Sequence, residues 1–459
     1  MINKTYSIIG LGKLGASMAA AIASRGFKVI GVDVLEKNVN LINEGHAPVE
    51  ETNLENTIQM YKNNIEATSS YENAIVNSDV TFVIVPTPTE SSGNFSLEYV
   101  KNAFTEIGKS LRDKKEYHLV VLTSTVLPGA TRFSLIPILE KESGKKCGYD
   151  FGLCYSPEFI ALGSIIHNFL NPDFNLIGEF DRESGDILEK CYKEIIENDA
   201  PNKRMSIENA ELTKIAVNTF ITTKITFANA LAETASKIFG GDIDVVTDAL
   251  GADKRIGKKY LKGGLGYGGP CFPRDNIAFN FISNAVNESS QIASATDKTN
   301  EHLTYRIAST IIQNLPPSPI VAILGLAYKP FTPVVEESHS LKLARLLKIR
   351  GAKVIGYDPL ANENARKEMN EYIVVIDGLK NCIALADGVV IATPDPEFLN
   401  IDESYFGGRN VFIYDCWRLL RGELENVSNN INYMALGVNK DMKKSVQILN
   451  NLWKEEDSK

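Results

Sequence analysis

The segment YSIIGLGKLGASMAAAIASRGFKVIGVDV, residues 6–34, constrains the fold of this chain more than any other feature. An apolar run ends in Gly10, Gly12 and Gly15, small residues follow, and a second apolar run ends at Asp33. This order predicts a strand, a glycine turn, a helix and a second, parallel strand. In such a turn the first glycine makes the bend, the second admits a pyrophosphate, and the third lets the helix pack against the strand.

Two features of this segment favour NAD as the cofactor. The amino end of the predicted helix, at Lys13 and Leu14, directs its dipole and N–H groups toward the phosphates. Asp33 lies 18 residues after Gly15, near the roughly 20 residues expected for the acid that binds the adenosine ribose. Since a carboxylate there would repel the 2′-phosphate of NADP, the sequence predicts NAD.

Two later apolar segments, residues 79–88 and 118–126, predict further strands of the same sheet. Each ends in small polar residues or proline. Ligands of an open parallel sheet lie beyond the carboxyl ends of its strands, so we expect Thr87, Pro88, Ser124 and Thr125 near the cofactor. Residues of this kind are equally common in strand-end turns that bind nothing.

Composition excludes several classes of protein. The length of 459 residues corresponds to about three domains. The net charge of −9 comes without a long basic run, so nucleic acid is not an expected partner. No 18-residue apolar run or signal segment is visible, which predicts a cytoplasmic protein outside the membrane. The six cysteines are far apart and no Cys/His cluster has zinc spacing, so we expect a reducing compartment and no metal.

The middle of the chain predicts one long helix. Residues 209–239 contain no turn signal, are alanine-rich in their second half, and are followed by Gly240 and Gly241. A long helix of this kind most often connects domains or forms a dimer surface. Lys214 and Asn218 are spaced i, i+4, so they share one face of it.

The segment NLPPSP, residues 314–319, indicates a linker because its prolines interrupt helices and sheets. The apolar segments that follow, at 320–330 and 352–359, repeat the pattern of the N-terminus without its third glycine. We therefore predict an α/β fold with two Rossmann-like doubly wound domains joined by a central helical domain with a long helix. The predicted domains are an NAD-binding domain at 1–200, a central helical domain at 201–300, and a second Rossmann-like domain at 315–459.

The most specific stretch is YLKGGLGYGGPCFPRD, residues 260–275. Its glycines indicate a backbone that turns sharply and approaches a ligand closely. If a helix begins near Pro273, Cys271 lies at its amino end, where the dipole favours the thiolate, and Asp275 returns to the same space one turn later. The alternative is a buried cysteine in a glycine-rich turn.

Six motifs in this order resemble the UDP-glucose/GDP-mannose dehydrogenase family, NAD-dependent enzymes that oxidise a nucleotide sugar to a uronic acid. They are GLGKLG with Asp33, TSTVLPG (123–129), the PEF…NPD segment (155–178), AELTKIAVNTF, GYGGPCFPRD and LGLAYKP. The resemblance runs along nearly the whole chain. It implies that the central domain at 201–300 carries the catalytic cysteine loop and that the domain at 315–459 binds the nucleotide sugar.

The resemblance implies a role for each matching position. Cys271 matches the nucleophile, Lys214 and Asn218 the pair that polarises the substrate oxygen, and Asp275 the acid that manages a proton or water. Glu158 and Thr125 match the water site. The substrate-binding positions implied are Glu158, Phe159, Lys214, Asn218, Arg255, Tyr260, Gly264, Gly268, Lys329 and Arg418.

The implied activity is a four-electron oxidation of the UDP-glucose 6-dehydrogenase type through a cysteine thiohemiacetal and thioester. UDP-N-acetylhexosamines (ManNAc, GlcNAc or GalNAc) and GDP-mannose are alternative substrates, because Ala161 and Leu162 stand where charged residues are frequent and Arg418 lies in an altered setting. A two-electron 3-hydroxyacid dehydrogenase and a nucleotide-binding regulator without turnover are more distant alternatives. The resemblance and the long helix together suggest a homodimer or a higher homo-oligomer.

Overall fold

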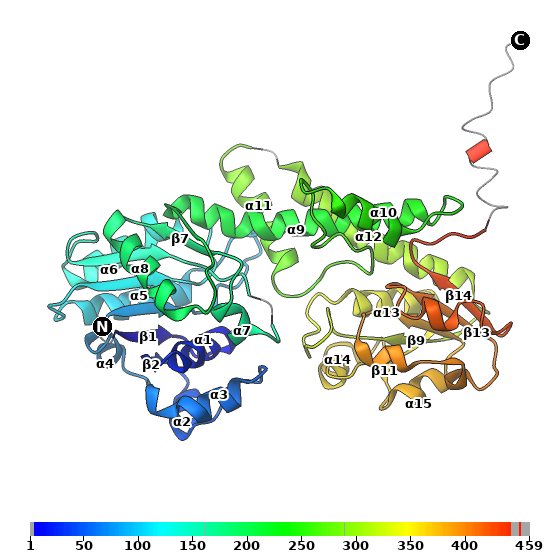
Figure 1. Cartoon of the computed structure of the whole chain (residues 1–459), viewed down its shortest axis with the longest axis horizontal. Coiled ribbons are helices and arrows are strands. Elements are labelled where there is room, and N and C mark those ends of the chain that lie inside the picture. Colours follow the sequence, from blue (N-terminus) through cyan, green and yellow to red (C-terminus); the bar gives the residue numbers. More distant parts are fainter. Residues whose placement is uncertain (1–3, 161, 289, 442–448, 451–459) are drawn as a thin grey trace, which may run out of the picture. The chain divides into compact units, whose positions relative to one another are not determined.

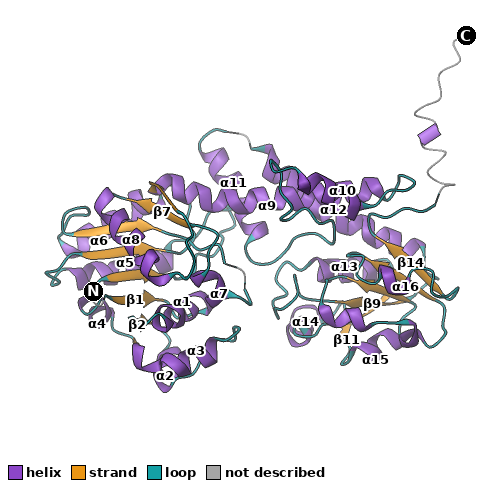
Figure 2. Cartoon of the chain, viewed as in Figure 1, coloured by secondary structure: helices purple, strands orange, loops and turns teal. Residues whose placement is uncertain are grey.

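The computed structural model describes residues 4–160, 162–288, 290–441 and 449–450, so Ala161 lies outside the described residues. The chain divides into two compact units, Met1–Val217 with Phe281–Asn287 and Asn218–Asn280 with Glu288–Lys459. Both contain a sheet with helices (Figures 1 and 2). The division into three domains stays a prediction, because the central helical residues and the C-terminal sheet fall into one compact unit.

The first unit is built on an eight-stranded sheet of order β3-β2-β1-β4-β5-β6-β7-β8. Its strands are β1 (Thr5–Ile9), β2 (Lys28–Val32), β3 (Ile65–Thr68), β4 (Val80–Val83), β5 (His118–Leu122), β6 (Phe151–Tyr155), β7 (Asn175–Glu179) and β8 (Asn202–Ser206). Only the β6–β7 pair is antiparallel among these neighbours. The predicted parallel strands at both ends of the glycine turn and after it are confirmed. The strand order reverses between β1 and β4, which is where such sheets bind dinucleotides.

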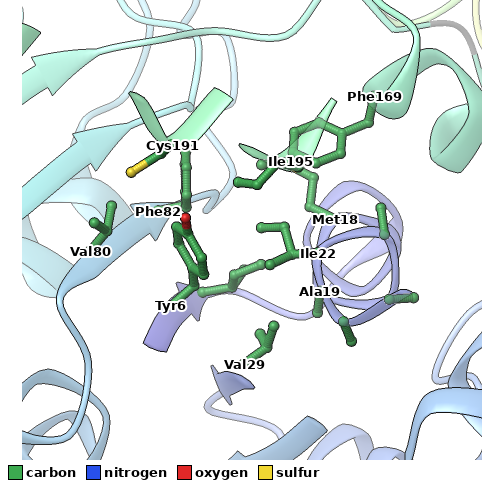
Figure 3. Close-up of a cluster of buried hydrophobic side chains, with 14 of the residues drawn as sticks. Tyr6, Met18, Ala19, Ile22, Val29, Val80, Phe82, Phe169, Cys191 and Ile195 are labelled. Atoms are coloured by element: carbon green, nitrogen blue, oxygen red, sulfur yellow. The ribbon is translucent and has the colours of Figure 1, made fainter. Parts of the chain in front are cut away.

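Helices cover both faces of this sheet. They are α1 (Lys13–Ser24), α2 (Glu36–Glu44), α3 (Leu54–Tyr61), α4 (Tyr71–Val76), α5 (Glu98–Leu111), α6 (Ile136–Ser143), α7 (Ile165–Leu170) and α8 (Arg182–Ile195). One buried cluster joins the sheet to α1, α3, α7 and α8, and another joins it to α4, α5 and α6. Figure 3 shows Tyr6 and Phe82 of the sheet packed with Met18 and Ile22 of α1 and Ile195 of α8.

The predicted long helix is α9, Ile207–Ala235, of 29 residues. It ends four residues before the predicted position. Lys237 and Ile238 donate their N–H groups to carbonyls three residues back, which tightens the chain before Gly240 turns it at φ +77°. The signal from Gly240 and Gly241 therefore marks the end of the turn rather than of the α-helix itself.

The second unit contains a parallel six-stranded sheet of order β11-β10-β9-β12-β13-β14. Its strands are β9 (Ile320–Leu324), β10 (Lys353–Tyr357), β11 (Val374–Val375), β12 (Gly388–Ile391), β13 (Val411–Asp415) and β14 (Ile431–Ala435). Its helices are α10 (Ile243–Ala252), α12 (Gln291–Gln313), α13 (His339–Ile349), α14 (Asn362–Met369), α15 (Leu379–Ala384) and α16 (Arg421–Leu424), and α11 (Phe272–Ala285) belongs to it as far as Asn280. This parallel sheet with its helices confirms the predicted second Rossmann-like fold. The predicted linker, residues 314–319, lies between α12 and β9.

The two Rossmann-like folds repeat one turn geometry. Gly10 and Gly325 have φ values of +97° and +93°. Asp33 accepts a hydrogen bond from the N–H of Leu11 at 2.8 Å, and Asp358 accepts one from Leu326 at 2.7 Å. In the described part of the chain, no helix has the length and apolar character needed to cross a membrane.

Candidate active site

The glycine turn between β1 and α1 has the geometry of a pyrophosphate cradle. A Cβ on Gly10 would lie 2.3 Å from the Ile84 carbonyl oxygen, and one on Gly15 would lie 1.8 Å from the Gly10 oxygen. A Cβ on Gly12 would meet nothing within 4 Å, so this position is open to a ligand. No side chain caps the amino end of α1, which leaves its first N–H groups available to an anion.

Asp33 supports the same site from the end of β2. Its carboxylate accepts hydrogen bonds from the N–H groups of Leu11 and Leu35, each at 2.8 Å. The acid predicted to bind the ribose therefore also holds the glycine turn in place. The residues present fit a dinucleotide on these grounds.

Polar residues that follow β4 and β5 are hydrogen-bonded to one another. Thr87 donates its hydroxyl to the Thr125 carbonyl at 2.8 Å, and the Ser124 hydroxyl bonds both the N–H and the carbonyl of Val85. This places Thr87 and Thr125 side by side at the carboxyl edge of the sheet, beside the glycine turn.

Lys214 of α9 reaches the residue pair that follows β6. Its ammonium donates to the Glu158 carbonyl at 2.7 Å and lies 4.6 Å from the centroid of the Phe159 ring. Burial raises the pKa of the Glu158 carboxyl to about 7, although the Lys214 charge acts in the opposite direction. A carboxyl that titrates near neutrality, beside a cation, is suited to act as a general base.

The second unit places the predicted nucleophile at the start of a helix. Cys271 is exposed and immediately precedes α11, as predicted from Pro273. Asp275, in the first turn, is fully buried and bonds its N–H to the Cys271 carbonyl at 2.9 Å. Its carboxylate accepts hydrogen bonds from Asn218 at 2.6 Å and from Arg274 at 3.0 Å. Cys271, Asn218 and Asp275, three of the predicted catalytic residues, therefore lie together at the start of α11.

The glycines before Cys271 are packed against protein. A Cβ would lie 2.6 Å from the Trp417 ring at Gly264 and 2.1 Å from the Glu337 carbonyl oxygen at Gly268. At Gly269, which has φ +81°, it would lie 2.6 Å from the Tyr328 ring. From the sequence we expected these glycines to let the backbone approach a ligand. In the structure, the space that a side chain would occupy at these three positions is filled by the protein's own side chains and backbone.

The remaining predicted substrate residues differ in setting. Tyr260 is half exposed and has φ +64°, a conformation that few non-glycine residues adopt. Lys329 follows β9, and its ammonium lies 5.8 Å from the centroid of the Tyr328 ring. Arg255 lies on an exposed turn, where its guanidinium pairs with Asp253 at 2.6 Å.

Arg418 is buried and held by the protein on every side. Its Nε and Nη2 donate to Asp244 at 2.8 and 2.9 Å, and Nη2 also donates to the Gly263 carbonyl. Its Nη1 donates to the carbonyls of Cys416 and Leu436. These five bonds use all five N–H groups of the guanidinium. Arg418 therefore fastens α10 and the glycine loop to the C-terminal sheet, and its role as a substrate ligand stays a prediction.

Several residues that support the site have no local signal in the sequence. Asn300 of α12 pairs with both the N–H and the carbonyl of Tyr267 in the glycine loop, at 3.0 and 2.9 Å. The Tyr267 hydroxyl donates to Asp297, which also accepts from Asn276 at 2.7 Å. Since Asn276 follows the catalytic candidate Asp275, this network ties the loop to the first turn of α11.

Comparison with known proteins decides the family. The chain matches the UDP-glucose/GDP-mannose dehydrogenase family in three successive parts: the NAD binding domain at residues 4–196, the central domain at 208–302, and the UDP binding domain at 322–422. The chain belongs to this family. It is an NAD-dependent nucleotide-sugar dehydrogenase, and NAD is its cofactor.

Relatives within the family carry different substrate names. The UDP-glucose 6-dehydrogenase AglM of Haloferax volcanii is 34% identical over 418 residues, covering 90% of this chain and 96% of that protein. A GDP-mannose 6-dehydrogenase of Pseudomonas putida is 37% identical over 356 residues, covering 77% and 80%. A solved UDP-glucose dehydrogenase from Pyrobaculum islandicum is 32% identical, with a TM-score of 0.84 over 95% of this chain and 98% of that one. The family is thus established, while these relatives differ in base and sugar.

Proposed function

We propose that this chain oxidises the C6 alcohol of a nucleotide sugar, UDP-glucose, to the uronic acid in two NAD-dependent steps through a covalent bond to Cys271. The cluster of Cys271, Asp275 and Asn218 at the start of α11 supports this proposal most directly. An exposed sulfur at a helix amino end, next to a fixed carboxylate and amide, is the arrangement that covalent aldehyde chemistry needs.

The reaction balances as one alcohol, two NAD⁺ and one water giving one carboxylate, two NADH and three protons. The Gly10–Gly15 turn and Asp33 would hold NAD, which would supply the hydride acceptor for both oxidations. The first oxidation gives an aldehyde, which the Cys271 sulfur attacks to form a thiohemiacetal. Loss of the second hydride leaves a thioester on Cys271, and water cleaves the C–S bond to return the thiol and release the acid.

The polar side chains would act on the charges that develop. Lys214 and Asn218 stabilise the oxyanion, a contribution of about 3 kcal/mol per donor. Glu158, with a pKa of about 7, takes the proton from the attacking water during thioester hydrolysis. Asp275, fixed by Asn218 and Arg274, holds its negative charge against the first turn of α11 and orients the amide of Asn218.

The choice of UDP-glucose rests on likeness to the relatives with that name. GDP-mannose is the second candidate substrate, because relatives named for it have similar identity to this chain but match a smaller share of it. UDP-N-acetylhexosamines are the third candidates. A panel of these sugars with NAD separates them: we expect the highest kcat/KM with UDP-glucose and two NADH per sugar consumed. One NADH per sugar, with an aldehyde or ketone product, would instead support a two-electron dehydrogenase.

The thiol can be tested directly, because the other five cysteines are buried. Iodoacetamide should alkylate the native enzyme once, at Cys271, and abolish formation of the acid. The variant Cys271→Ala should bind NAD with unchanged affinity, form no acid, and take up no label. Full turnover by Cys271→Ala would show that the thiol takes no part in the mechanism. If the wild-type protein reduces no NAD with any sugar of the panel, the chain would instead be a nucleotide-binding regulator without turnover.

We also propose that the chain forms a homodimer through α9 and α10. Phe220 and Phe227, seven residues apart on α9, are 67% and 53% exposed, and Val245 of α10 is 67% exposed. Large apolar side chains that are exposed on helices of a single chain are candidates for burial in an interface. Phe227→Glu should shift the dimer to monomer in light scattering, whereas a wild-type monomer at micromolar concentration would refute the assignment.

Five buried cysteines without a disulfide are compatible with the cytoplasmic location that we propose.

A further inference from the structure

One buried carboxylate in the first unit lies between two of the predicted catalytic elements. Glu211, in the second turn of α9, is 0% exposed. One of its carboxylate oxygens accepts the N–H of Gly129 at 2.6 Å, and the other accepts the N–H of Thr131 at 3.0 Å. Charged acceptors make the stronger hydrogen bonds, and a buried carboxylate requires such donors.

These two donors belong to the turn that follows β5. Gly129 has φ +91°, so the chain reverses there and presents its next N–H groups at the amino end of the helical residues 131–143. A carboxylate at this position also complements the helix dipole. Thr125 stands four residues before Gly129 in the same turn, and Thr87 bonds its carbonyl.

The other end of the connection is the helix that carries Lys214. Lys214 lies three residues after Glu211, less than one turn along α9, so rotation or translation of the helix at Glu211 moves the Lys214 ammonium as well. That ammonium bonds the Glu158 carbonyl at 2.7 Å. A neighbouring acid, Glu208, bonds the Arg132 side chain, but both of those side chains are about one-third exposed.

We propose that Glu211 is a positioning residue that locks the Thr125 turn to the helix bearing Lys214 and thereby sets the geometry for hydrolysis of the thioester. The inference rests on the proposed function, in which Glu158 and Thr125 form the water site. A carboxylate is required because it offers an acceptor oxygen to each N–H, whereas the amide of glutamine offers one acceptor and turns a donor toward the second N–H.

The experiment compares Glu211→Gln with the control Glu208→Gln, which changes the neighbouring acid on the same helix. Rapid mixing of enzyme, NAD and the preferred sugar measures the first burst of NADH, and steady-state assays measure hydrolysis. A displacement of about 1 Å at a reacting centre can cost 10²-fold, so we expect Glu211→Gln to lose on the order of 10- to 100-fold in steady-state kcat. We expect its burst to survive and intact-mass spectrometry to find the sugar on Cys271, while Glu208→Gln keeps near wild-type hydrolysis.

Other outcomes overturn the inference. An unchanged kcat in Glu211→Gln would mean that the lock is unnecessary, and equal losses of burst and hydrolysis without a covalent adduct would mean that Glu211 only supports the fold. If the glutamine variant does not fold, Glu211→Asp keeps both acceptors on a side chain one methylene shorter and should show the same selective loss, smaller in size.

A second measurement separates this inference from the proposed function. If the wild-type enzyme releases one NADH per sugar, the proposed function fails, and the lock is then tested by amide exchange alone. Residues 125–131 should exchange faster in Glu211→Gln than in Glu208→Gln. Equal exchange in the two variants would refute the lock whatever the reaction is.

Discussion

Replacement of Glu158 by glutamine should slow thioester hydrolysis and, at pH 8, stabilise the folded protein. Glu158→Gln keeps the shape of the side chain and removes its charge and its ability to accept a proton. We expect hydrolysis to fall about 10²- to 10⁴-fold, the usual contribution of a general base. The first burst of NADH should remain, because it precedes the step that needs the base.

The magnitude on stability follows from the raised pKa. Burial lifts the pKa of the Glu158 carboxyl from 4.5 to about 7. At about 1.4 kcal/mol for each tenfold change, the charged form costs the folded protein about 3 kcal/mol above pH 7. Since the folded pKa is the higher one, stability from the protonated carboxyl is complete below pH 4.5 and is lost as the pH rises through 7. Glu158→Gln should therefore unfold at a higher temperature than wild type at pH 8 and at the same temperature near pH 4.5.

The assay for catalysis is the pH dependence of hydrolysis. At pH 6 about one-tenth of the Glu158 carboxyls are ionised, so the wild-type rate should fall about tenfold for each pH unit below 7. In Glu158→Gln this acid limb should disappear from the residual rate. The reasoning is refuted if the variant keeps the limb near pH 7, or if it is less stable than wild type at pH 8.

Three further predictions concern residues that hold the sites together. Asp33→Asn keeps an acceptor for the Leu11 N–H but removes the charge, so the ratio of kcat/KM for NAD over NADP should fall at least tenfold; an unchanged ratio would contradict the ribose assignment. Asp297→Asn weakens the bond from the Tyr267 hydroxyl and should lower stability by about 1–3 kcal/mol in urea unfolding and reduce kcat, with NAD affinity unchanged. Arg418→Lys loses the bidentate pair with Asp244, so it should lower the free energy of unfolding by about 3 kcal/mol and leave the KM for the sugar nucleotide unchanged. A raised KM with unchanged stability would instead make Arg418 a substrate ligand.

The sequence was sufficient for features that depend on local spacing. The Gly10–Gly15 turn, the parallel strands that flank it, the second Rossmann-like sheet and the start of α11 at Phe272 follow from glycine and proline positions and from apolar periodicity. The end of α9 was misplaced by four residues, because the tightened turn before Gly240 lies within a stretch of good helix formers.

Features that depend on distant partners were outside the reach of sequence reasoning. Glu211 bonds N–H groups about 80 residues earlier in the chain, and Arg418 bonds a carboxylate 174 residues away. The glycines at 264 and 268 are required by Trp417 and by the Glu337 carbonyl. In each case a motif drew attention to the segment, but the physical reason for the residue lies in a tertiary contact that no local pattern encodes.

Two glutamates of the first unit, Glu158 and Glu211, differ in whether their surroundings fix the charge or let it change. Burial of the carboxyl group is the main cause that raises the pKa of both. At Glu211 two backbone N–H groups oppose that rise and fix the carboxylate in one position, which suits a lock. At Glu158 burial outweighs the Lys214 charge and leaves the carboxyl poised near pH 7, where gaining and losing a proton cost little. The hydrogen-bond donors around each carboxyl group therefore decide whether the group can exchange a proton during the reaction.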